Sequence, residues 1–306
     1  KPLYEENSCI YIFKYDILEK KKHRIGYKPL LFVMNDIESQ DIDTEFDFKT
    51  TELLQDLSID NIKKIVLITG VNGGIGTEIA KKFKKMGYYV VGTSRSKNLQ
   101  KYFIDRYIQS DLTEENSVKH IIQSIEKNEK RIDCIVHNAA VQICKPIWEQ
   151  TEKEWDLTFD CNLKTIYRFV KHGINLLKKS KGNIINIGSV HSVNTSDKIA
   201  AYACTKAAIS GLTRNLSIEL GQFGIRVNTV SPGAVDTNML RDGLLRGHVS
   251  GSNSDELVES LGQKHILKRV GKPYEIANLI WHVNTNQFLT GSNIIIDGGA
   301  TIKLST

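Results

Sequence analysis

The sequence predicts a doubly wound α/β domain, on three observations. From residue 65 onward, short β-branched runs alternate with stretches of helical periodicity. Most of these runs are apolar throughout, which is typical of strands in a parallel sheet that is buried on both faces. The first run leads directly into a glycine-rich turn and then into a helical stretch. At 306 residues, the chain is long enough for one such domain and an appendage.

About seven strands are expected in this domain, which takes in residues 61–306. The predicted strands span 65–69, 88–94, 106–111, 132–138, 183–189, 225–233 and 292–297. The predicted helices span 75–86, 114–128, 152–179, 201–221 and 273–284. Because crossovers between parallel strands are right-handed, these helices should cover both faces of the sheet.

Residues 1–60 do not follow this alternation and are expected to form a small β-rich extension. A hairpin with a basic turn near 19–26 and a further strand at 30–34 are predicted. Segment 35–60 holds nine Asp or Glu against one Lys, which indicates a solvated linker with room for one short helix, "TTELLQDL". An isolated hairpin of this size has only marginal stability in water. It should therefore pack on the main domain, pair with a partner or form the end of an upstream domain. The sequence, which starts at Lys1, leaves these three possibilities open.

The composition argues against several classes of protein. No apolar run approaches the roughly 20 residues that a membrane-spanning helix needs. The net charge is +6, and the lysine clusters at 19–24 and 81–87 lack the aromatic residues and motifs of nucleic-acid binders. Five cysteines show neither CxxC pairs nor metal-like spacing with histidine. Reduced thiols, no metal site and a cytoplasmic protein are therefore expected.

The glycine-rich turn "TGVNGGIG", residues 69–76, predicts a Rossmann-like dinucleotide site. Gly70, Gly74 and Gly76 leave no Cβ where the chain turns, where a diphosphate approaches the backbone and where helix meets strand. The helix that follows offers free N–H groups and a partial positive charge to the diphosphate. The other predicted contacts in this turn are Asn72, Gly73 and Ile75.

The end of the second predicted strand indicates which dinucleotide binds. An acidic residue here usually accepts a hydrogen bond from the ribose 2′-OH of NAD, whereas the 2′-phosphate of NADP needs a cation. Ser94 stands in the position of the acid and Arg95 follows it. A guanidinium can bind a phosphate through two hydrogen bonds. NADP is therefore favoured, and NAD remains possible.

The stretch "SVHSVNTSDKIAAYACTK", residues 189–206, contains a constellation with chemical meaning. Tyr202 and Lys206 are four residues apart, so they share one face of the predicted helix. Ser189 arrives from the end of the preceding predicted strand. A phenol, an ammonium and a hydroxyl could thus meet at one substrate oxygen.

With these motifs in order, the chain from about residue 65 to the C-terminus resembles the short-chain dehydrogenase/reductase family in its compact single-domain form. The matching pieces are "TGVNGGIG", "SDLT" at 110–113, "HNAA" at 137–140, "CNL" at 161–163, Ser189, "YACTK" at 202–206, "SPG" at 231–233 with Thr237, and "IIIDGG" at 294–299. The resemblance implies a hydride transfer between a nicotinamide cofactor and a ketone or secondary alcohol.

The resemblance also implies a role for each catalytic residue. Tyr202 would exchange a proton with the substrate oxygen, and Ser189 would hydrogen-bond that oxygen. Lys206 would hold the nicotinamide ribose and, with the oxidised nicotinamide, lower the pKa of the phenol, which is near 10 in a free tyrosine. Asn162 would anchor a water that links Lys206 to solvent.

Further cofactor contacts follow from the same resemblance. Asp111 would accept a hydrogen bond from the adenine amino group, beside Leu112. The remaining implied contacts, around the nicotinamide, are Asn138, Ala139, Ala140, Pro232, Gly233, Val235 and Thr237. The family usually has glycine where Ala140 stands, so this methyl group should tilt the nicotinamide or narrow the pocket.

Substrate identity is expected to depend on segment 238–268, a long polar stretch that should act as a lid. The predicted pocket residues are Val141, Gln142, His191 and Met239. His191 more plausibly shapes the pocket than serves as a second acid/base, because Tyr202 already has that function. Arg241 and Arg246 are weaker candidates for binding an anionic substrate.

The predicted function is thus an NADP-dependent oxidoreductase, and 3-oxoacyl-carrier-protein reductase and sugar or polyol dehydrogenase are the nearest subtypes. The sequence does not separate these two. Two alternatives stay open: a reductase module of a larger enzyme, and a dinucleotide-binding regulator without activity. A homodimer or homotetramer is expected, because the two long helices carry apolar residues that could face a second copy: Leu157, Ile166, Phe169, Leu212, Leu216 and Leu220.

Overall fold

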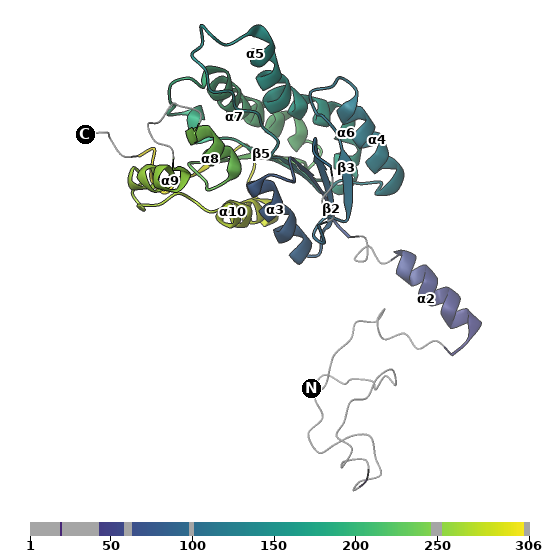
Figure 1. The fold of residues 1–306 in the computed structure, drawn as a ribbon. Coiled ribbons are helices and arrows are strands. Elements are labelled where there is room, and N and C mark those ends of the chain that lie inside the picture. The colour runs from purple at the N-terminus through teal and green to yellow at the C-terminus, as the bar shows by residue number, and fades with distance from the viewer. Residues whose placement is uncertain (1–18, 20–42, 58–62, 98–100, 246–252, 303–306) are drawn as a thin grey trace. The chain divides into compact units, whose positions relative to one another are not determined.

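In the computed structural model, a parallel sheet of seven strands forms the centre of the unit Lys64–Thr306 (Figure 1). The structure describes residues 19, 43–57, 63–97, 101–245 and 253–302. Across the sheet the order is β3 (Arg106–Gln109), β2 (Tyr89–Ser94), β1 (Ile65–Thr69), β4 (Cys134–His137), β5 (Asn183–Ile187), β6 (Arg226–Pro232) and β7 (Asn293–Ile296). Every pairing between neighbouring strands is parallel. The predicted doubly wound sheet is confirmed.

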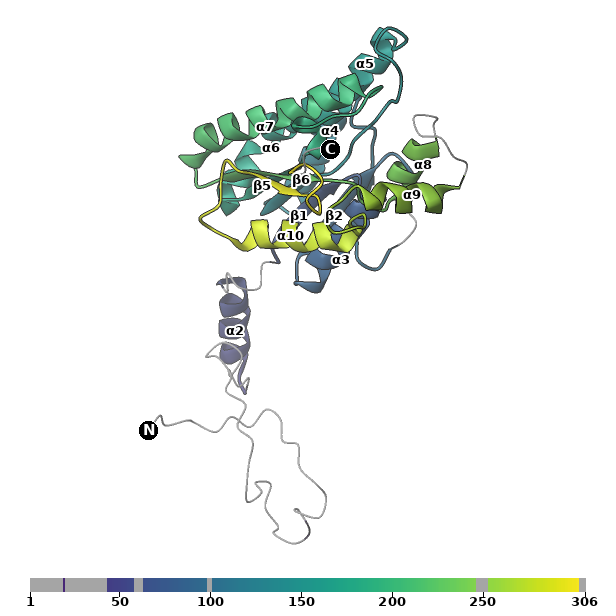
Figure 2. The same cartoon turned by 90° about the vertical axis from the view of Figure 1, so that its left-hand side faces the viewer.

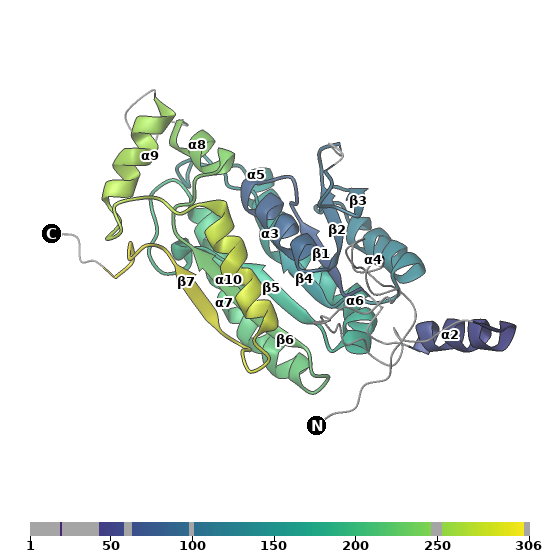
Figure 3. The same cartoon turned by 90° about the horizontal axis from the view of Figure 1, so that it is seen from below.

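Helices cover both faces of this sheet (Figures 2 and 3). On one face lie α4 (Ser117–Asn128), α6 (Thr165–Ser180) and α7 (Ala200–Gly221), and on the other α3 (Gly74–Lys85) and α10 (Pro273–Thr285). The side chains of β1 alternate between the two layers. Ile65 and Leu67 pack in the first core, whereas Val66 and Ile68 pack in the second. Both sides of the strand are therefore buried, which explains its uninterrupted apolar sequence.

The strand order reverses between β1 and β4, which lie side by side at the centre of the sheet. From β1 the chain proceeds outward through β2 and β3, and from β4 it proceeds in the opposite direction through β5, β6 and β7. The loops that leave the carboxyl ends of β1 and β4 therefore diverge and leave a crevice between them. Ligands of open α/β sheets bind at such a point.

The long helix predicted over 152–179 consists of three parts. These are α5 (Glu152–Phe159), the π-helical turn η2 (Asp160–Lys164) and α6. A capping box at Thr151 and Glu154 starts α5, where each residue's side chain accepts the other's backbone N–H at 3.3 and 2.9 Å. The π-helical turn interrupts the regular period, and such turns are frequent at functional sites.

The segment predicted as a long polar lid, residues 238–268, contains two helices in its described parts. It contains α8 (Asn238–Leu245) and α9 (Ser254–Gln263), and residues 246–252 lie outside the described part. Asn253 caps α9, because its Oδ1 accepts the N–H of Asp255 at 3.0 Å. Glycine and serine residues around this cap interrupt the helical periodicity of the sequence, so the two short helices were not predicted from it.

The unit Lys1–Lys63 is described mainly by one helix, α2 (Glu45–Leu57). Thr44 and Asp47 cap its first turn, where the Asp47 N–H donates to Thr44 Oγ1 at 3.1 Å and the Thr44 N–H donates to Asp47 Oδ2 at 2.9 Å. The helix starts earlier than the predicted stretch. The predicted hairpin and the strand at 30–34 lie outside the described residues, apart from residue 19.

Four of the six apolar residues assigned to an oligomer interface face the sheet, which corrects that expectation. Ile166, Phe169, Leu216 and Leu220 are buried in the core between the sheet and its helices. Apolar residues recur with the same helical periodicity whether they face the sheet or a second copy of the chain. The sequence alone therefore did not show which of these residues pack on the sheet. A separate shallow hollow on the outside of these helices is lined by Phe159, Leu163, Tyr167, Ala208 and Leu212, with Asp160 and Lys164.

Candidate active site

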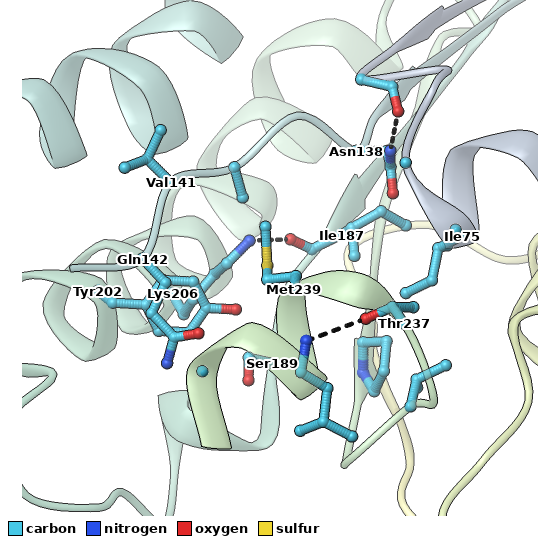
Figure 4. A pocket seen from close by; sticks show the side chains of 18 of the residues that line it. Ile75, Asn138, Val141, Gln142, Ile187, Ser189, Tyr202, Lys206, Thr237 and Met239 are labelled. Carbon is cyan, nitrogen blue, oxygen red and sulfur yellow. Dashed lines mark hydrogen bonds between the residues drawn. The ribbon is translucent and has the colours of Figure 1, made fainter. Parts of the chain in front are cut away.

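A cavity of about 750 Å³ lies at the carboxyl ends of the strands and brings together nearly all the predicted site residues (Figure 4). Every predicted cofactor contact lines it except Gly76, and all four predicted substrate-pocket residues line it. Of the predicted catalytic residues, Ser189, Tyr202 and Lys206 line the cavity, whereas Asn162 does not. The loops after β1, β2, β4, β5 and β6 therefore converge on one site.

The turn after β1 has no space for larger side chains, as a diphosphate cradle requires. Gly70 has a φ of +63°, which few other residues adopt. A Cβ at Gly76 would overlap the carbonyl oxygen of Gly70, so this glycine permits close packing without reaching the cavity. The turn leads into α3 at Gly74, whose first N–H groups have no partner one turn earlier in the helix. These donors and the helix dipole fit an anionic group.

Asn138 fixes this turn from the end of β4. Its Nδ2 donates to the carbonyl oxygens of Thr69 and Gly70 at 3.1 and 3.0 Å, and Thr69 Oγ1 accepts the N–H groups of Asn138 and Ala139, both at 3.0 Å. The side chain of Asn138 thus clamps two strand ends together (Figure 4). Ala139 and Ala140 continue the cavity wall beside it.

The loop after β2 presents a guanidinium to the cavity. Gln109 Nε2 donates to the Arg95 carbonyl oxygen at 3.0 Å, and Asn72 Nδ2 donates to Ser96 Oγ at 2.9 Å, so the backbone of this loop is held in place. Within the described residues, no hydrogen bond or ion pair engages the exposed Arg95 guanidinium. It is therefore available to a phosphate.

Asp111 lies near this guanidinium, on the same side of the cavity. Burial alone would raise the pKa of Asp111, but hydrogen bonds from the Thr113 hydroxyl and N–H, together with the charge of Arg95, outweigh burial and lower that pKa. Asp111 is thus an ionised acceptor, which fits a donor such as an adenine amino group.

Ser189, Tyr202 and Lys206 meet where β5 ends and α7 begins. Lys206 is buried, and its Nζ donates to the carbonyl oxygen of Ile187 at 2.6 Å and lies 5.4 Å from the Tyr202 ring centroid (Figure 4). Burial lowers the pKa of Lys206 to about 8. Burial raises the pKa of Tyr202 to about 12, and a hydrogen bond with Ser189 opposes that rise.

In the protein by itself the pKa of Tyr202 is shifted upward, and the expectation that Lys206 and the oxidised nicotinamide together lower this pKa stays a prediction. Burial of the phenolate is the largest cause of this upward shift, and the hydrogen bond with Ser189 opposes it. With a pKa of about 12, Tyr202 is protonated at neutral pH. The site therefore holds a protonated phenol, Tyr202, beside the Ser189 hydroxyl and the Lys206 ammonium. This arrangement suits protonation of a carbonyl oxygen.

Asn162 lies behind the cavity wall, in the π-helical turn η2. Its Oδ1 accepts the N–H of Val141 at 2.7 Å, and its Nδ2 donates to the Val141 carbonyl oxygen at 2.9 Å and to Thr205 Oγ1 at 3.1 Å. The side chain is therefore occupied by the pocket loop and by α7. The expected water-anchoring role of Asn162 stays a prediction.

The substrate end of the cavity combines His191 with residues of α8 and α9. The His191 ring lies edge-on to the Tyr202 ring, at 6.1 Å between centroids, and burial lowers the pKa of His191 although a hydrogen bond with the Asn194 backbone opposes this. A neutral His191 ring therefore lines the cavity beside Tyr202, and its role in shaping the substrate pocket stays a prediction. From the lid segment, Met239, Leu244 and Leu261 add an apolar wall.

Arg241 does not face the cavity, which corrects its weaker assignment as an anion-binding residue. Its Nε donates to Asp236 at 2.7 Å and its Nη1 to Asp255 at 2.5 Å, so it joins α8 to α9. Arg246 lies outside the described residues. The acidic partners are five residues before and fourteen residues after Arg241 in the sequence, so only the folded lid reveals this pairing.

Several residues that line the cavity were not predicted from the sequence. They include Cys161, Val190, Asp197 and Ile199. Val190 directly follows Ser189 after the end of a strand, so its position in the sequence could have predicted that it lines the cavity. Cys161 belongs to the "CNL" piece of the family resemblance, and Lys264 and His265, which also line the cavity, lie in segment 238–268, which was expected to determine the substrate.

Other kinds of site receive no support from the described ranges. None of the helices there combines the length and the apolar character of a membrane span. Nor do these ranges hold a group of three or more His, Cys, Asp or Glu side chains that could bind a metal ion. No disulfide joins the four cysteines described there, Cys134, Cys144, Cys161 and Cys204.

Comparisons with known proteins match most of this chain to one family. The family described as Enoyl-(Acyl carrier protein) reductase matches residues 70–301, well over half of the chain. A 3-oxoacyl-[acyl-carrier-protein] reductase of Buchnera aphidicola subsp. Schizaphis graminum is 30% identical over 247 residues, which are 78% of this chain and 97% of the relative.

Solved structures are similar over the same part of the chain. The ligand-free aldohexose dehydrogenase of Thermoplasma acidophilum has a TM-score of 0.75 at 29% identity, over 80% of this chain and 97% of that one. ElxO with NADP bound has a TM-score of 0.70 at 29% identity, over 79% of this chain and 100% of that one. Together with the parallel sheet, the glycine turn and the Ser189–Tyr202–Lys206 cluster, these matches show that the chain belongs to the short-chain dehydrogenase/reductase family and is an NAD(P)-dependent oxidoreductase.

Proposed function

We propose that this protein transfers a hydride between NADP(H) and a ketone or secondary alcohol, with Ser189, Tyr202 and Lys206 acting at the substrate oxygen. The observation that carries this proposal is the meeting of these three side chains in one cavity, with Tyr202 hydrogen-bonded to Ser189 and Lys206 buried beside the phenol ring. The glycine turn that opens the same cavity supports a dinucleotide there.

The proton has a defined route in this proposal. The bound nicotinamide would supply the hydride that adds to the carbonyl carbon. Ser189 would hydrogen-bond the carbonyl oxygen and stabilise the charge that develops on it. The O–H bond of Tyr202 would break as the O–H bond of the product alcohol forms. Because the pKa of Tyr202 is about 12, the proton is present on the phenol at neutral pH before reduction starts.

The direct test is oxidation of NADPH in the presence of small ketones, 3-oxoacyl thioesters and oxidised sugars. The relatives include a 3-oxoacyl-carrier-protein reductase and an aldohexose dehydrogenase at 30% and 29% identity, so the proposal extends to the carbonyl class and not to one of its members. We expect turnover with at least one of these substrates. Failure with all of them, in a protein that binds NADPH, would contradict the proposed reaction.

NADP is the proposed cofactor because of the residues that follow β2. Ser94 stands where an NAD site usually has an acidic residue, so no carboxylate is present at this position. The Arg95 guanidinium faces the cavity and has no hydrogen-bond or ion-pair partner in the described ranges. ElxO, which has a similar fold, has been solved with NADP bound. A carboxylate would repel the 2′-phosphate, whereas a guanidinium can bind it at two points.

Replacement of Arg95 by Ala tests the cofactor proposal. We expect the dissociation constant for NADPH to rise about 10- to 100-fold, since a charge-assisted hydrogen bond is worth about 1.5–3 kcal/mol. The constant for NADH should change much less, and Lys97→Ala, an exposed cation two residues away that does not line the cavity, serves as the control. Fluorescence titration measures both constants, and an unchanged ratio between them would mean that Arg95 does not recognise the 2′-phosphate.

We also propose that the protein is a homodimer or homotetramer. The support is the hollow lined by Phe159, Leu163, Tyr167, Ala208 and Leu212, with Asp160 and Lys164, where Tyr167 is 52% exposed. The same apolar hollow on a second copy could cover it, as an interface around a two-fold axis requires. Light scattering should give two or four times the mass of one chain, and a monomer at micromolar concentration would contradict the proposal.

A further inference from the structure

Thr205 is a fully buried residue between Tyr202 and Lys206 on α7. Its Oγ1 donates to the carbonyl oxygen of Tyr202 at 2.7 Å and accepts from Nδ2 of Asn162 at 3.1 Å. One hydroxyl therefore joins the first turns of α7 to the π-helical turn η2. It does not line the cavity, so contact with a ligand does not explain its placement.

The hydrogen bonds continue from Asn162 to the wall of the cavity. Asn162 bonds both backbone groups of Val141, at 2.7 Å to the N–H and 2.9 Å to the carbonyl oxygen. Val141 and its neighbour Gln142 line the cavity near Tyr202 and Lys206 (Figure 4). An unbroken series of four hydrogen bonds thus links the backbone of Tyr202 to the loop that forms the substrate side of the site.

We propose that Thr205 is a positioning residue that fixes the Tyr202 phenol relative to the Val141–Gln142 loop through Asn162. This role rests on the proposed oxidoreductase function. It follows because Thr205 lies within one helical turn of Tyr202 and bonds its backbone carbonyl oxygen, and a displacement of about 1 Å at a reacting group can cost about 100-fold in rate. Removal of the hydroxyl also leaves the Asn162 amide and the Tyr202 carbonyl oxygen each short of a buried partner.

Thr213 offers a matched comparison on the same helix. It is equally buried, its Oγ1 accepts from Asn186 Nδ2 at 2.9 Å, and it shares a hydrogen bond of 2.7 Å with Thr229 Oγ1. None of these three residues lines the cavity. Thr205→Val and Thr213→Val therefore remove the same kind of hydroxyl from α7, and only the first removes a link to the site.

The test compares Thr205→Val, Thr205→Ser and Thr213→Val in the full chain. Both valine variants should lower the melting temperature by similar amounts. Only Thr205→Val should lower kcat, by about 10- to 100-fold, with the dissociation constant for NADPH within about threefold of wild type. Thr205→Ser keeps the hydroxyl and should recover kcat to within about threefold of wild type. The alkaline limb of the pH profile of kcat should shift in Thr205→Val and not in Thr213→Val.

Three results would overturn the positioning role. One is a kcat in Thr205→Val that matches that of Thr213→Val, and another is a kcat in Thr205→Ser that is as low as in the valine variant. If Thr205→Val does not fold, Thr205→Ala replaces it in the comparison. The third contradicting result is then a Thr205→Ala variant with the full activity of the wild type. A wild-type protein without turnover would instead refute the proposed reaction, and the role of Thr205 with it.

Discussion

Replacement of Tyr202 by Phe is expected to lower the turnover of the proposed ketone reduction by about 10²- to 10⁴-fold, the range that a general acid contributes. Phenylalanine keeps the ring that lies edge-on to His191 at 6.1 Å and beside Lys206 Nζ at 5.4 Å, so the cavity should keep its shape. Only the hydroxyl is lost, and with it the hydrogen bond to Ser189 and the proton for the substrate oxygen. NADPH oxidation measures the loss.

Cofactor binding separates this result from a structural defect. The dissociation constant for NADPH in Tyr202→Phe should stay within about threefold of wild type, because the glycine turn and Arg95 are unchanged. Tyr274→Phe, a change on the exposed side of α10 away from the cavity, is the matched control and should keep full activity. Undiminished turnover in Tyr202→Phe would show that another group supplies the proton.

Much of the fold follows from local signals in the sequence. The strands β1, β4 and β5 are buried along their whole length and are mostly apolar, although Asn183 and Asn186 lie in β5 and His137 ends β4. The glycine turn marks where β1 ends and α3 begins, since Gly70 and Gly76 permit contacts that a Cβ would prevent. Parallel strands then bring their carboxyl ends to one edge, which is why residues far apart in the sequence line one cavity.

Other features depend on contacts that no local pattern records. The π-helical turn around Asn162 depends on the pocket loop, whose Val141 bonds its side chain, and on Thr205 of another helix. Arg241 looks like an anion-binding residue in the sequence, but in the folded protein its guanidinium binds Asp236, just before α8, and Asp255 in α9. Burial sets the pKa of Tyr202, and burial is a property of the packed protein. The sequence therefore predicts well which residues lie together in the site, but it predicts their protonation states less well.

Replacement of Lys206 by Met is expected to change the pH dependence of stability, because Lys206 is a buried cation. Burial lowers the pKa of Lys206 from its usual 10.5 to about 8. Below pH 8 the residue is charged in both the folded and the unfolded protein, so the folded state bears the full cost of burying the charge. Between pH 8 and 10.5 the folded protein releases the proton first, so the unfolded state binds more protons and the stability of the wild type rises with pH.

Methionine has a similar length and carries no proton, so its contribution to stability does not vary with pH. The free energy of unfolding of Lys206→Met minus that of the wild type should therefore fall by about 3 kcal/mol as the pH rises from 7 to 10.5, at about 1.36 kcal/mol per pKa unit. Urea unfolding at several pH values measures this difference, and groups common to both proteins cancel in it. Exposed Lys171→Met gives the baseline, and a flat difference for Lys206→Met would show that the site holds the charge without cost.

The same substitution should remove most of the turnover, since it removes a buried ammonium that lies 5.4 Å from the Tyr202 ring centroid. A variant that gains relative stability at pH 7 while it loses activity would show that the fold retains a destabilising charge for the reaction. The alternative, a structural lysine that only bonds the Ile187 carbonyl oxygen, predicts lower stability at every pH and little effect on kcat. The two roles of this residue thus differ in the sign of the stability change at pH 7 and in the effect on turnover, and both can be measured on one pair of proteins.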